Sequence, residues 1–371
     1  MLSVSNDGSI PLGYTLAEAP PLKRAIIWLA SRARTQVEGA LLCFAVGSIF
    51  CLLNWGLGLV AGALVARQVA RRLPNVHFGY LIASGYMGYL LWTQGLSSSI
   101  ALANTDPNSP INVIHQLTSM TVPFSLTIFQ PYSWIPVVAL IILLFLTIWR
   151  MEPDYALPPD PAVFADIEKD LPKTKPSTPA EKLENLWILN VLFFAAGMYY
   201  FVRSGFALNI SSMIMLFTVT GALLHWTPIR FIKSFVESAK TAGPLILQYP
   251  LYGGIMGLLA YIPMEGGHAL EEILSSALVT GANEYTLPFL TFIASIIISL
   301  FVPSGGGHWG VQGPIAVQYH HDGIEFAKAF SGGSEHMVAS LVTFDAPVHM
   351  KYRKLTQDWF MPKNLRTTED E

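Results

Sequence analysis

Charged side chains are scarce in this sequence of 371 residues. Asp, Glu, Lys and Arg make up 13% of the chain, whereas hydrophobic residues make up 52%. The apolar residues cluster into long runs, and one soluble core of this size does not need so much apolar surface. Several runs approach the roughly 20 residues that a helix needs to cross a hydrocarbon core. The composition therefore predicts a membrane protein with the lipid bilayer as its main surroundings.

An excess of positive charge is also absent. The formal net charge is -3 and the pI is near 6.3, so the sequence predicts no nucleic-acid partner. Only two cysteines occur, Cys43 and Cys51, and both lie in one apolar run, which favours small buried residues over a disulfide. His320, His321 and His336 lack the spacing of a zinc site, so no metal is expected.

A secretory leader is not indicated at the N-terminus. Residues 1–21 are mostly polar and contain proline, and residues 22–37 form an amphipathic stretch with several basic side chains. No uninterrupted apolar region leads to a small-residue cleavage site. We therefore expect residues 1–38 to form a polar, amphipathic segment ahead of the membrane part.

Seven apolar runs predict membrane helices. They are 39–66, 78–103, 133–149, 186–202, 208–226, 242–262 and 287–302, with a short continuation at 309–317. One long polar insertion, 150–185, is rich in Pro, Asp, Glu and Lys, which is typical of a solvated linker. We expect it to join two membrane halves, 39–149 and 186–330, with a polar tail at 331–371.

Lys and Arg orient these runs, because they accumulate in short loops on the cytoplasmic side of a membrane. Segments 104–132 and 263–286 contain neither residue, so we expect both to face outward. Basic residues gather at 67–72, in the linker and at 230–240, so we expect these segments in the cytoplasm. The alternation predicts an all-α, multi-pass protein.

The run 39–66 is too long for one span and has basic residues on both flanks. As a single helix its 28 residues would extend about 42 Å. A re-entrant hairpin fits better. Its expected tip is 54–58, which reads Asn54-Trp55-Gly56-Leu57-Gly58.

A second break follows the run 287–302. Residues 303–313 contain a proline and five glycines, and no continuous helix is expected to survive them. Non-helical backbone at membrane depth is tolerated only inside protein or beside a water-filled cavity. We therefore expect a second hairpin that enters from the side opposite the first.

Two interrupted segments in corresponding halves are typical of a secondary transporter with two inverted repeats. Half-helices that begin at such tips present unpaired N–H groups and a partial positive charge, which hold a carboxylate without buried Lys or Arg. We therefore predict an anion site at the two tips. Its candidate residues are Asn54, Trp55, Gly56, Ser304, Gly305, Gly306, Gly307, His308, Trp309 and Gln312, followed in second rank by Gln94, Ser97, Ser98 and Gln248.

Each feature also has a structural interpretation. The three glycines could serve close helix packing, and Asn54 could only cap a helix. His308 is either a proton-coupling group or a hydrogen-bonded structural histidine. An intramembrane serine protease would need Ser304 beside His308, but the intervening glycines disfavour a regular helix and no nucleophile elbow is present. We therefore expect no enzyme.

These motifs resemble the short-chain fatty acid transporter family, which looks related to a wider group of inverted-repeat carboxylate carriers. The resemblance rests on the stretch 54–60 and on Val302-Pro303-Ser304-Gly305-Gly306-Gly307-His308-Trp309 with Gln312-Gly313-Pro314. It covers roughly 35–330. It implies uptake of short-chain fatty acids such as acetoacetate or butyrate across a bacterial inner membrane, without a cofactor. Coupling to a proton or a sodium ion, and a homo-oligomeric state, are left open.

The chain also departs from that family, whose members look longer at both ends. Beyond Phe330 the sequence turns polar and basic, which predicts no closing membrane helix. One hypothesis is that this tail is frame-shifted or misassigned sequence; absence of a closing helix in every frame of the encoding DNA would count against it. The alternative to a transporter is a truncated, non-transporting relative or an interaction scaffold.

Overall fold

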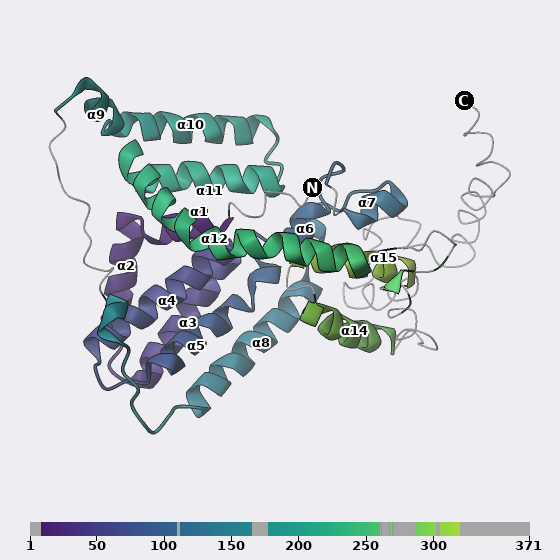
Figure 1. The fold of residues 1–371 in the computed structure, drawn as a ribbon, viewed down its shortest axis with the longest axis horizontal. Coiled ribbons are helices and arrows are strands. Elements are labelled where there is room, and N and C mark those ends of the chain that lie inside the picture. The colour runs from purple at the N-terminus through teal and green to yellow at the C-terminus, as the bar shows by residue number, and fades with distance from the viewer. Residues whose placement is uncertain are drawn as a thin grey trace. The chain divides into compact units, whose positions relative to one another are not determined.

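The structure is a computed structural model of the chain. It describes residues 9–109, 112–164, 177–259, 261, 267, 269–270, 273, 286–301 and 305–319. These residues form α-helices and short 3₁₀ helices, and no strand is found among them (Figure 1). The all-α class is therefore confirmed. The chain divides into two compact units, residues 1–102 with 133–250, and residues 103–132 with 251–371.

The centre of the first unit is a helical hairpin made of α3 (Gln36–Leu53) and α4 (Trp55–Arg72). The two helices run antiparallel, because Gly39 lies against Val69 at one end while Gly58 lies against Cys51 at the other. Asn54 is the only residue between them, so the break falls within the expected tip 54–58. The hairpin is the centre of a buried apolar core.

Helix α5 (Phe78–Tyr89) packs on both arms of this hairpin. The expected run 78–103 is not one helix, since α5 is followed by η1 (Trp92–Gln94) and α6 (Ser99–Ala103). The chain turns because it meets the end of α3. The Leu96 N–H donates to the Leu52 carbonyl (2.7 Å), which is one of the carbonyls that a helix end leaves without an intrahelical partner.

Part of the N-terminal segment is buried in the protein, although its sequence predicts a polar, amphipathic segment. It forms α1 (Ser9–Ala17) and α2 (Pro20–Ala30), and Leu12 and Leu16 of α1 are buried. Helix α1 packs against α4 and α11. The buried Thr15 hydroxyl is satisfied by the Pro11 carbonyl (2.6 Å), so a polar residue is accommodated inside the protein at little cost.

Two described helices are long and apolar enough to cross a membrane by length and composition, namely α3 and α8 (Pro131–Arg150). Shorter apolar helices are α10 (Trp187–Arg203) and α11 (Ile210–Leu224), which pack on each other. Many large apolar side chains of α8 are exposed, including Ile142, Leu143 and Trp149, as expected for a helix surface that meets lipid.

The expected linker contains short helices, and the helix after α11 begins earlier than the sequence predicts. The described ends of the linker contain η3 (Pro161–Phe164) and α9 (Pro179–Glu184). The expected run 242–262 begins earlier, because α12 (Pro228–Leu259) is a continuous helix of 32 residues. Its basic residues were expected in a loop, but Lys and Arg are good helix formers and extend the helix.

The second unit contains a second pair of helices, α14 (Leu287–Phe301) and α15 (Gly305–Tyr319). Here the structure corrects the sequence expectation, because residues 305–313 of the expected break are helical. Each glycine in a helix costs about 1 kcal/mol, and packing against α14 offsets this cost. Residues 302–304, including the candidate Ser304, lie outside the described residues.

The segment 104–132, expected to be an outward loop, also has structure of its own. It contains α7 (Val113–Thr118) and η2 (Phe124–Leu126). Helix α7 packs against α15 within the second unit. This segment therefore belongs to the second compact unit.

Candidate functional site

Asn54 lies at the tip of the first hairpin and is completely buried. Its side-chain Oδ1 accepts a hydrogen bond from the Leu57 N–H (2.9 Å), which caps the N-terminus of α4. Within the part of the chain that the structure describes, its side-chain Nδ2 has no hydrogen-bond partner. A buried, unpaired donor of this kind costs about 1–3 kcal/mol, so its retention at this tip needs an explanation.

Two other segments enclose the tip. The Trp55 N–H donates to the Ser97 hydroxyl (2.8 Å), which brings the turn after η1 onto the start of α4. On another side lies Gly13 of α1, where an added Cβ would stand 2.3 Å from the Leu57 nitrogen and 2.4 Å from the Gly56 carbonyl carbon. Only glycine permits this close backbone approach. The tip is therefore an enclosed, uncharged site with hydrogen-bonding capacity.

The remaining candidates of the first unit have different positions. The Trp55 ring meets the edge of Tyr89, with ring centroids 6.3 Å apart. Ser98 accepts from the Ala101 N–H (3.5 Å), so its hydroxyl supports the start of α6. Gln94 is half-buried in η1. The backbone of Gln248 belongs to α12, and its side chain lies outside what the structure describes.

The second hairpin carries a hydrogen-bond network between its two helices. Gln312 of α15 donates through Nε2 to the Thr291 carbonyl (2.9 Å), which directs its Oε1 toward the Ser295 hydroxyl and the His308 ring. The other ring nitrogen, Nδ1, lies 3.2 Å from the Ser299 hydroxyl. The pairs Ser299 with His308 and Ser295 with Gln312 show that α14 and α15 run antiparallel.

This network can hold His308 in either protonation state. Because Gln312 Oε1 is an acceptor, the facing His308 Nε2 carries a proton (N···O 2.5 Å). The Ser299 hydroxyl also lies 2.7 Å from the Ser295 carbonyl, to which it can donate. In that orientation its oxygen can accept a hydrogen bond from Nδ1–H, and in the other orientation the hydroxyl donates a hydrogen bond to a neutral Nδ1. Gain of a proton by His308 therefore leaves no polar atom of this group unpaired.

Trp309 is anchored outside the hairpin, within the second unit. Its indole Nε1 donates to the side-chain Oδ1 of Asn104 (3.1 Å). Asn104 is itself held in place, because its carbonyl accepts from the Asn112 side chain (3.2 Å) and from the Val122 N–H (2.9 Å). The indole position is thus fixed by the segment 104–132.

Three glycines form the first turn of α15. Gly306 and Gly307 are buried and Gly305 is half-buried. The first N–H groups of a helix have no intrahelical partner, and without side chains in the way these three positions allow close approach to the backbone.

Several residues of these two arrangements were missed by reasoning from sequence. Gly13, Asn104 and Thr291 carry no local signal, because their roles depend on contacts with residues distant in the chain. Ser295 and Ser299 did carry a signal. Two serines four residues apart in an otherwise apolar helix lie on one face, which is typical of a polar seam toward a neighbouring helix.

These features define the class of the protein. It is an all-helical protein with apolar helices long enough to cross a membrane and with a buried helix break at Asn54. Comparison with known proteins gives the family: the model of the short-chain fatty acid transporter family matches residues 9–329. The chain belongs to the short-chain fatty acid transporter family. This assignment indicates a transport protein rather than an enzyme.

Two relatives agree with the family match, and both carry the name "Putative short-chain fatty acid transporter". The relative from Escherichia coli (strain K12) is 35% identical over 317 residues, which are 83% of this chain and 69% of the relative. The relative from Haemophilus influenzae is 31% identical over 323 residues, which are 82% of this chain and 69% of the relative. No solved structure matches the chain significantly.

A third similarity is short and points to another family. Cytochrome P450-terp of a Pseudomonas species is 37% identical over 54 residues, which are 15% of this chain and 13% of the cytochrome. This match covers too little of either chain to show a family.

Proposed function

We propose that the protein is a secondary transporter of short-chain fatty acids and that the tip of its first hairpin holds the substrate carboxylate. The observation that carries this proposal is the buried Asn54 Nδ2, a donor with no partner among the described residues. A carboxylate oxygen accepts strongly from such a donor. A bound carboxylate would therefore give this buried donor a partner.

The surroundings of Asn54 favour a carboxylate over a cation. Helix α4 begins at Trp55 and directs a partial positive charge toward the tip, but the C-terminal end of α3 at Leu53 brings the opposite partial charge there, so the preference rests on the neutral donors. The Ser97 hydroxyl oxygen already accepts from the Trp55 N–H, so its own proton is available to a second acceptor. Donors without formal charge bind an anion weakly enough for release, which a carrier requires.

We further propose that the second hairpin supplies the opposite tip of an inverted repeat. Backbone N–H groups at Gly305, Gly306 and Gly307, with Ser304, would contact the substrate. His308 would take up the coupling proton, because its hydrogen-bond partners can serve both protonation states. Coupling to sodium is the alternative. The printed names of the two relatives support short-chain fatty acids as substrates, and acetoacetate and butyrate are the proposed ones.

The proposed location is the bacterial inner membrane, with the basic segments on the cytoplasmic side. The bacterial origin of the two relatives and the candidate spans α3 and α8 support it. The competing proposal is a membrane relative that folds but does not transport. Stable insertion without any thermal stabilisation by butyrate or acetoacetate would favour that proposal.

Transport by purified protein in lipid vesicles tests the carboxylate site. In Asn54→Asp the helix cap remains, but the donor is lost and a negative charge faces the substrate. Loss of a hydrogen bond to a charged group is worth about 1.5–3 kcal/mol, so we expect half-saturation for butyrate uptake to rise about 100-fold. Unchanged uptake in this variant would contradict the site.

Two further variants complete that experiment. Asn75→Asp introduces the same charge on an exposed loop residue and should leave uptake unchanged, which controls for the added charge. The double variant Ser304→Ala, His308→Ala tests the second tip. If butyrate or acetoacetate flux persists in it at the unmodified rate, the second tip takes no part in binding or coupling.

A further inference from the structure

The Asn54 site is closed in the structure. Asn54 is completely buried, so a substrate reaches its Nδ2 only after one of the covering segments has moved. One of these segments is the turn after η1, whose Ser97 meets the Trp55 N–H. The other is α1, which packs against α4 on one side and against α11 on the other (Figure 1). All of them belong to the first unit.

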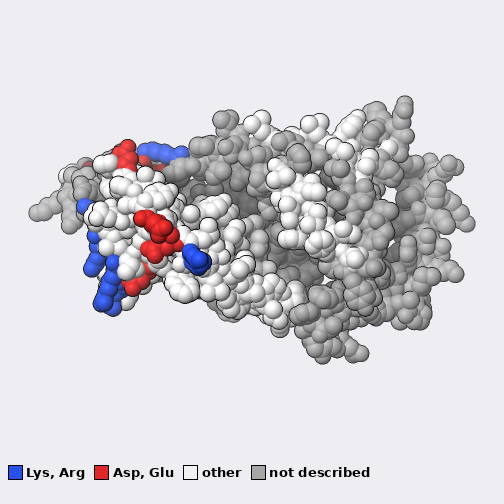
Figure 2. Space-filling view, turned by 90° about the horizontal axis from the view of Figure 1, so that it is seen from below, with Lys and Arg blue, Asp and Glu red and all other residues white. Residues whose placement is uncertain are grey.

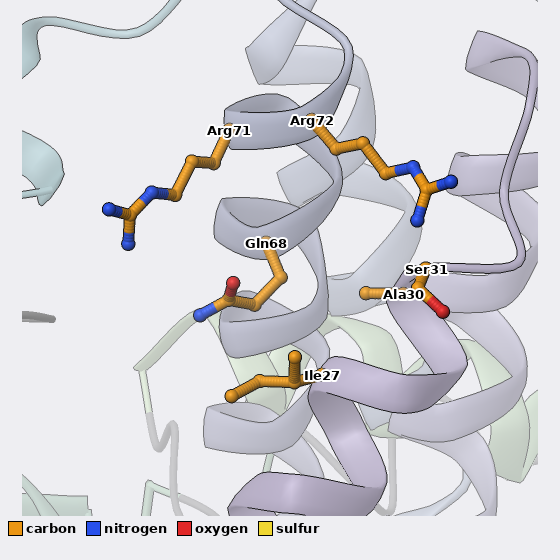
Figure 3. A pocket seen from close by; sticks show the side chains of 6 residues that line it. All are labelled: Ile27, Ala30, Ser31, Gln68, Arg71 and Arg72. Atoms are coloured by element: carbon orange, nitrogen blue, oxygen red, sulfur yellow. The ribbon is translucent and has the colours of Figure 1, made fainter.

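A pocket described elsewhere in this unit does not lead to the tip. It lies between α2 and the end of α4, and Gln68, Arg71 and Arg72 are among the residues that line it. Gln68 follows Asn54 by 14 residues, so the pocket lies about 21 Å along α4 from the tip. Figure 3 shows the Arg71 and Arg72 side chains pointing away from each other, and Figure 2 shows described Lys and Arg side chains gathered in the left half of the view. Basic side chains at a helix end are typical of the cytoplasmic boundary of a membrane, so the tip lies away from that boundary.

Helix α1 covers the Asn54 amide with its backbone. A Cβ added to Gly13 would stand 2.8 Å from the Asn54 Oδ1 and 2.3 Å from the Leu57 nitrogen. Because Gly13 has no side chain, this contact can open without any side chain of α1 being withdrawn from α4. Helix α1 has nine residues, fewer than the roughly 12–15 that an isolated helix needs, so its position depends on the contacts it makes.

A buried polar contact holds α1 in this position. The His225 Nε2 donates to the Thr15 carbonyl (2.8 Å) in the last turn of α1, where a helix leaves carbonyls without an intrahelical partner. The Thr15 hydroxyl lies 3.1 Å from the Ser238 hydroxyl of α12. All three residues are buried. We call Thr15, His225 and Ser238 the α1 latch.

The apolar contacts of α1 hold it less firmly in a bilayer than they would in water. Leu12 and Leu16 are buried, but lipid tails are as apolar as Leu, so transfer of these side chains from protein to lipid costs little. A polar group exposed to lipid finds no replacement for a lost hydrogen bond. The α1 latch therefore determines whether α1 stays on the tip. Two residues, Glu18 and Ala19, join α1 to α2 and give α1 a point about which to tilt.

We propose that α1 is a lid over the Asn54 site, that the α1 latch holds this lid closed, and that opening of the lid admits the carboxylate of the substrate. The proposal rests on the proposed function, because it concerns access to the same site. When the lid opens, Gly13 leaves Asn54 and the Nδ2 donor becomes accessible. When the lid closes, the site is again separated from its surroundings.

Labelling of a thiol at the tip tests the lid without a transport assay. The reporter is Asn54→Cys in a chain whose two native cysteines are replaced by alanine, treated with a small, negatively charged methanethiosulfonate in mild detergent. Gly13→Ala pushes α1 away from the backbone of α4, and we expect it to speed labelling at least tenfold. Gly39→Ala is the matched control, because its Cβ would stand 2.5 Å from Val69 at the other end of the hairpin. No acceleration by Gly13→Ala, or equal acceleration by Gly39→Ala, would overturn the lid.

A disulfide across the α1 latch tests the lid in butyrate uptake by vesicles. In Thr15→Cys, Ser238→Cys the two sulfurs replace hydroxyls that are 3.1 Å apart, and a small approach brings them to the roughly 2.05 Å of a disulfide. We expect oxidation to lower uptake at least tenfold and a reductant to restore it. The control Gly197→Cys, Val219→Cys, with Cβ atoms 3.4 Å apart, links α10 to α11 and should transport equally in both redox states.

The outcomes separate the lid from the proposed function. Equal uptake before and after oxidation, with the cross-link verified by mass, would overturn the lid. If the cysteine pair does not cross-link or Gly13→Ala does not fold, His225→Ala removes the donor of the α1 latch and should still speed labelling of the tip at least threefold. Unchanged labelling in that variant would overturn the proposal. Failure of the proposed function looks different, because the reduced protein then takes up no butyrate while labelling still depends on α1.

Discussion

The two helical hairpins differ in how the polar groups near their tips are satisfied. In the first hairpin, Asn54 is fully buried and its side-chain Nδ2 has no partner. In the second, His308 and Gln312 exchange hydrogen bonds with each other and with Ser295 and Ser299 of the facing helix. One hairpin thus has unused hydrogen-bonding capacity at its tip, and the other uses its polar side chains to hold its own helices together.

This difference distinguishes side chains that remain available to a ligand from side chains that stabilise their own hairpin. A sequence motif alone does not make this distinction. A motif shows which side chains occur near a break, but a side chain already bonded to its own hairpin has less to offer a ligand. The proposed carboxylate contact therefore rests mainly on Asn54, while His308 and Gln312 join the two helices of the second hairpin. The hairpins also differ in packing, since Gly58 lies against the backbone of Cys51 while Gly310 has open space around it.

The largest expected effect concerns that packing. In Gly58→Ala the new Cβ would stand 2.4 Å from the Cys51 Cα, which forces the two helices apart. We expect a loss of about 3 kcal/mol or more in stability, measured as a lower unfolding temperature in detergent. Gly310→Ala is the matched control in the second hairpin. It should be neutral or stabilise by about 0.5–1 kcal/mol, and equal losses in both variants would contradict the difference.

A second prediction separates the contribution of His308 to stability from its contribution to substrate binding. His308→Ala removes the hydrogen bonds to Gln312 and Ser299 and leaves partly buried polar atoms unpaired. We expect it to cost about 2 kcal/mol in stability while changing the affinity for butyrate less than Asn54→Asp does. Unfolding temperature and substrate titration measure the two quantities. Full stability together with lost binding would instead make His308 a direct ligand contact.

A smaller effect is expected from the two tryptophans. Trp309→Phe removes the hydrogen bond from the indole Nε1 to Asn104, which should cost about 1 kcal/mol. Trp55→Phe keeps an aromatic ring next to Tyr89, so its cost should be smaller. Thermal unfolding of both variants tests the order. The reverse order would show that the Asn104 contact contributes little to the second unit.

The smallest effect is a pH dependence of the first unit. His225 lies beyond the C-terminal end of α11, where its Nε2 donates to the Thr15 carbonyl (2.8 Å), and burial lowers its pKa below the ordinary 6.5. The unfolded chain then binds a proton at pH values where the folded chain does not. Its contribution to stability is therefore complete above about pH 6.5 and declines as the pH falls below that value.

The variant His225→Gln keeps a donor for the Thr15 carbonyl but does not titrate. Its unfolding temperature should fall less than that of the unmodified protein between pH 7.5 and pH 5. Parallel pH profiles for the two proteins would show that His225 does not carry the effect.

Some of the fold could be predicted because it depends on local chemistry. The all-α class follows from the apolar runs, and the break at Asn54 follows from a polar residue and glycines inside an apolar stretch. The end of α5 could not be predicted, because the chain turns there to meet the Leu52 carbonyl of another helix. The helical state of Gly305 to Gly307 was also missed, since packing against α14 outweighs the low helix propensity of glycine.

By itself the sequence determined the membrane character, the family motifs and the types of residue at the two breaks, because hydrophobicity and backbone propensity are properties of short segments. Tertiary structure alone decided which of those residues are already satisfied. Asn54 keeps an unpaired donor because Gly13 and Ser97 enclose it without reaching Nδ2. His308 and Gln312 are paired because antiparallel packing brings the serines of α14 opposite them. Hydrogen-bond partners distant in the chain cannot be read from local sequence.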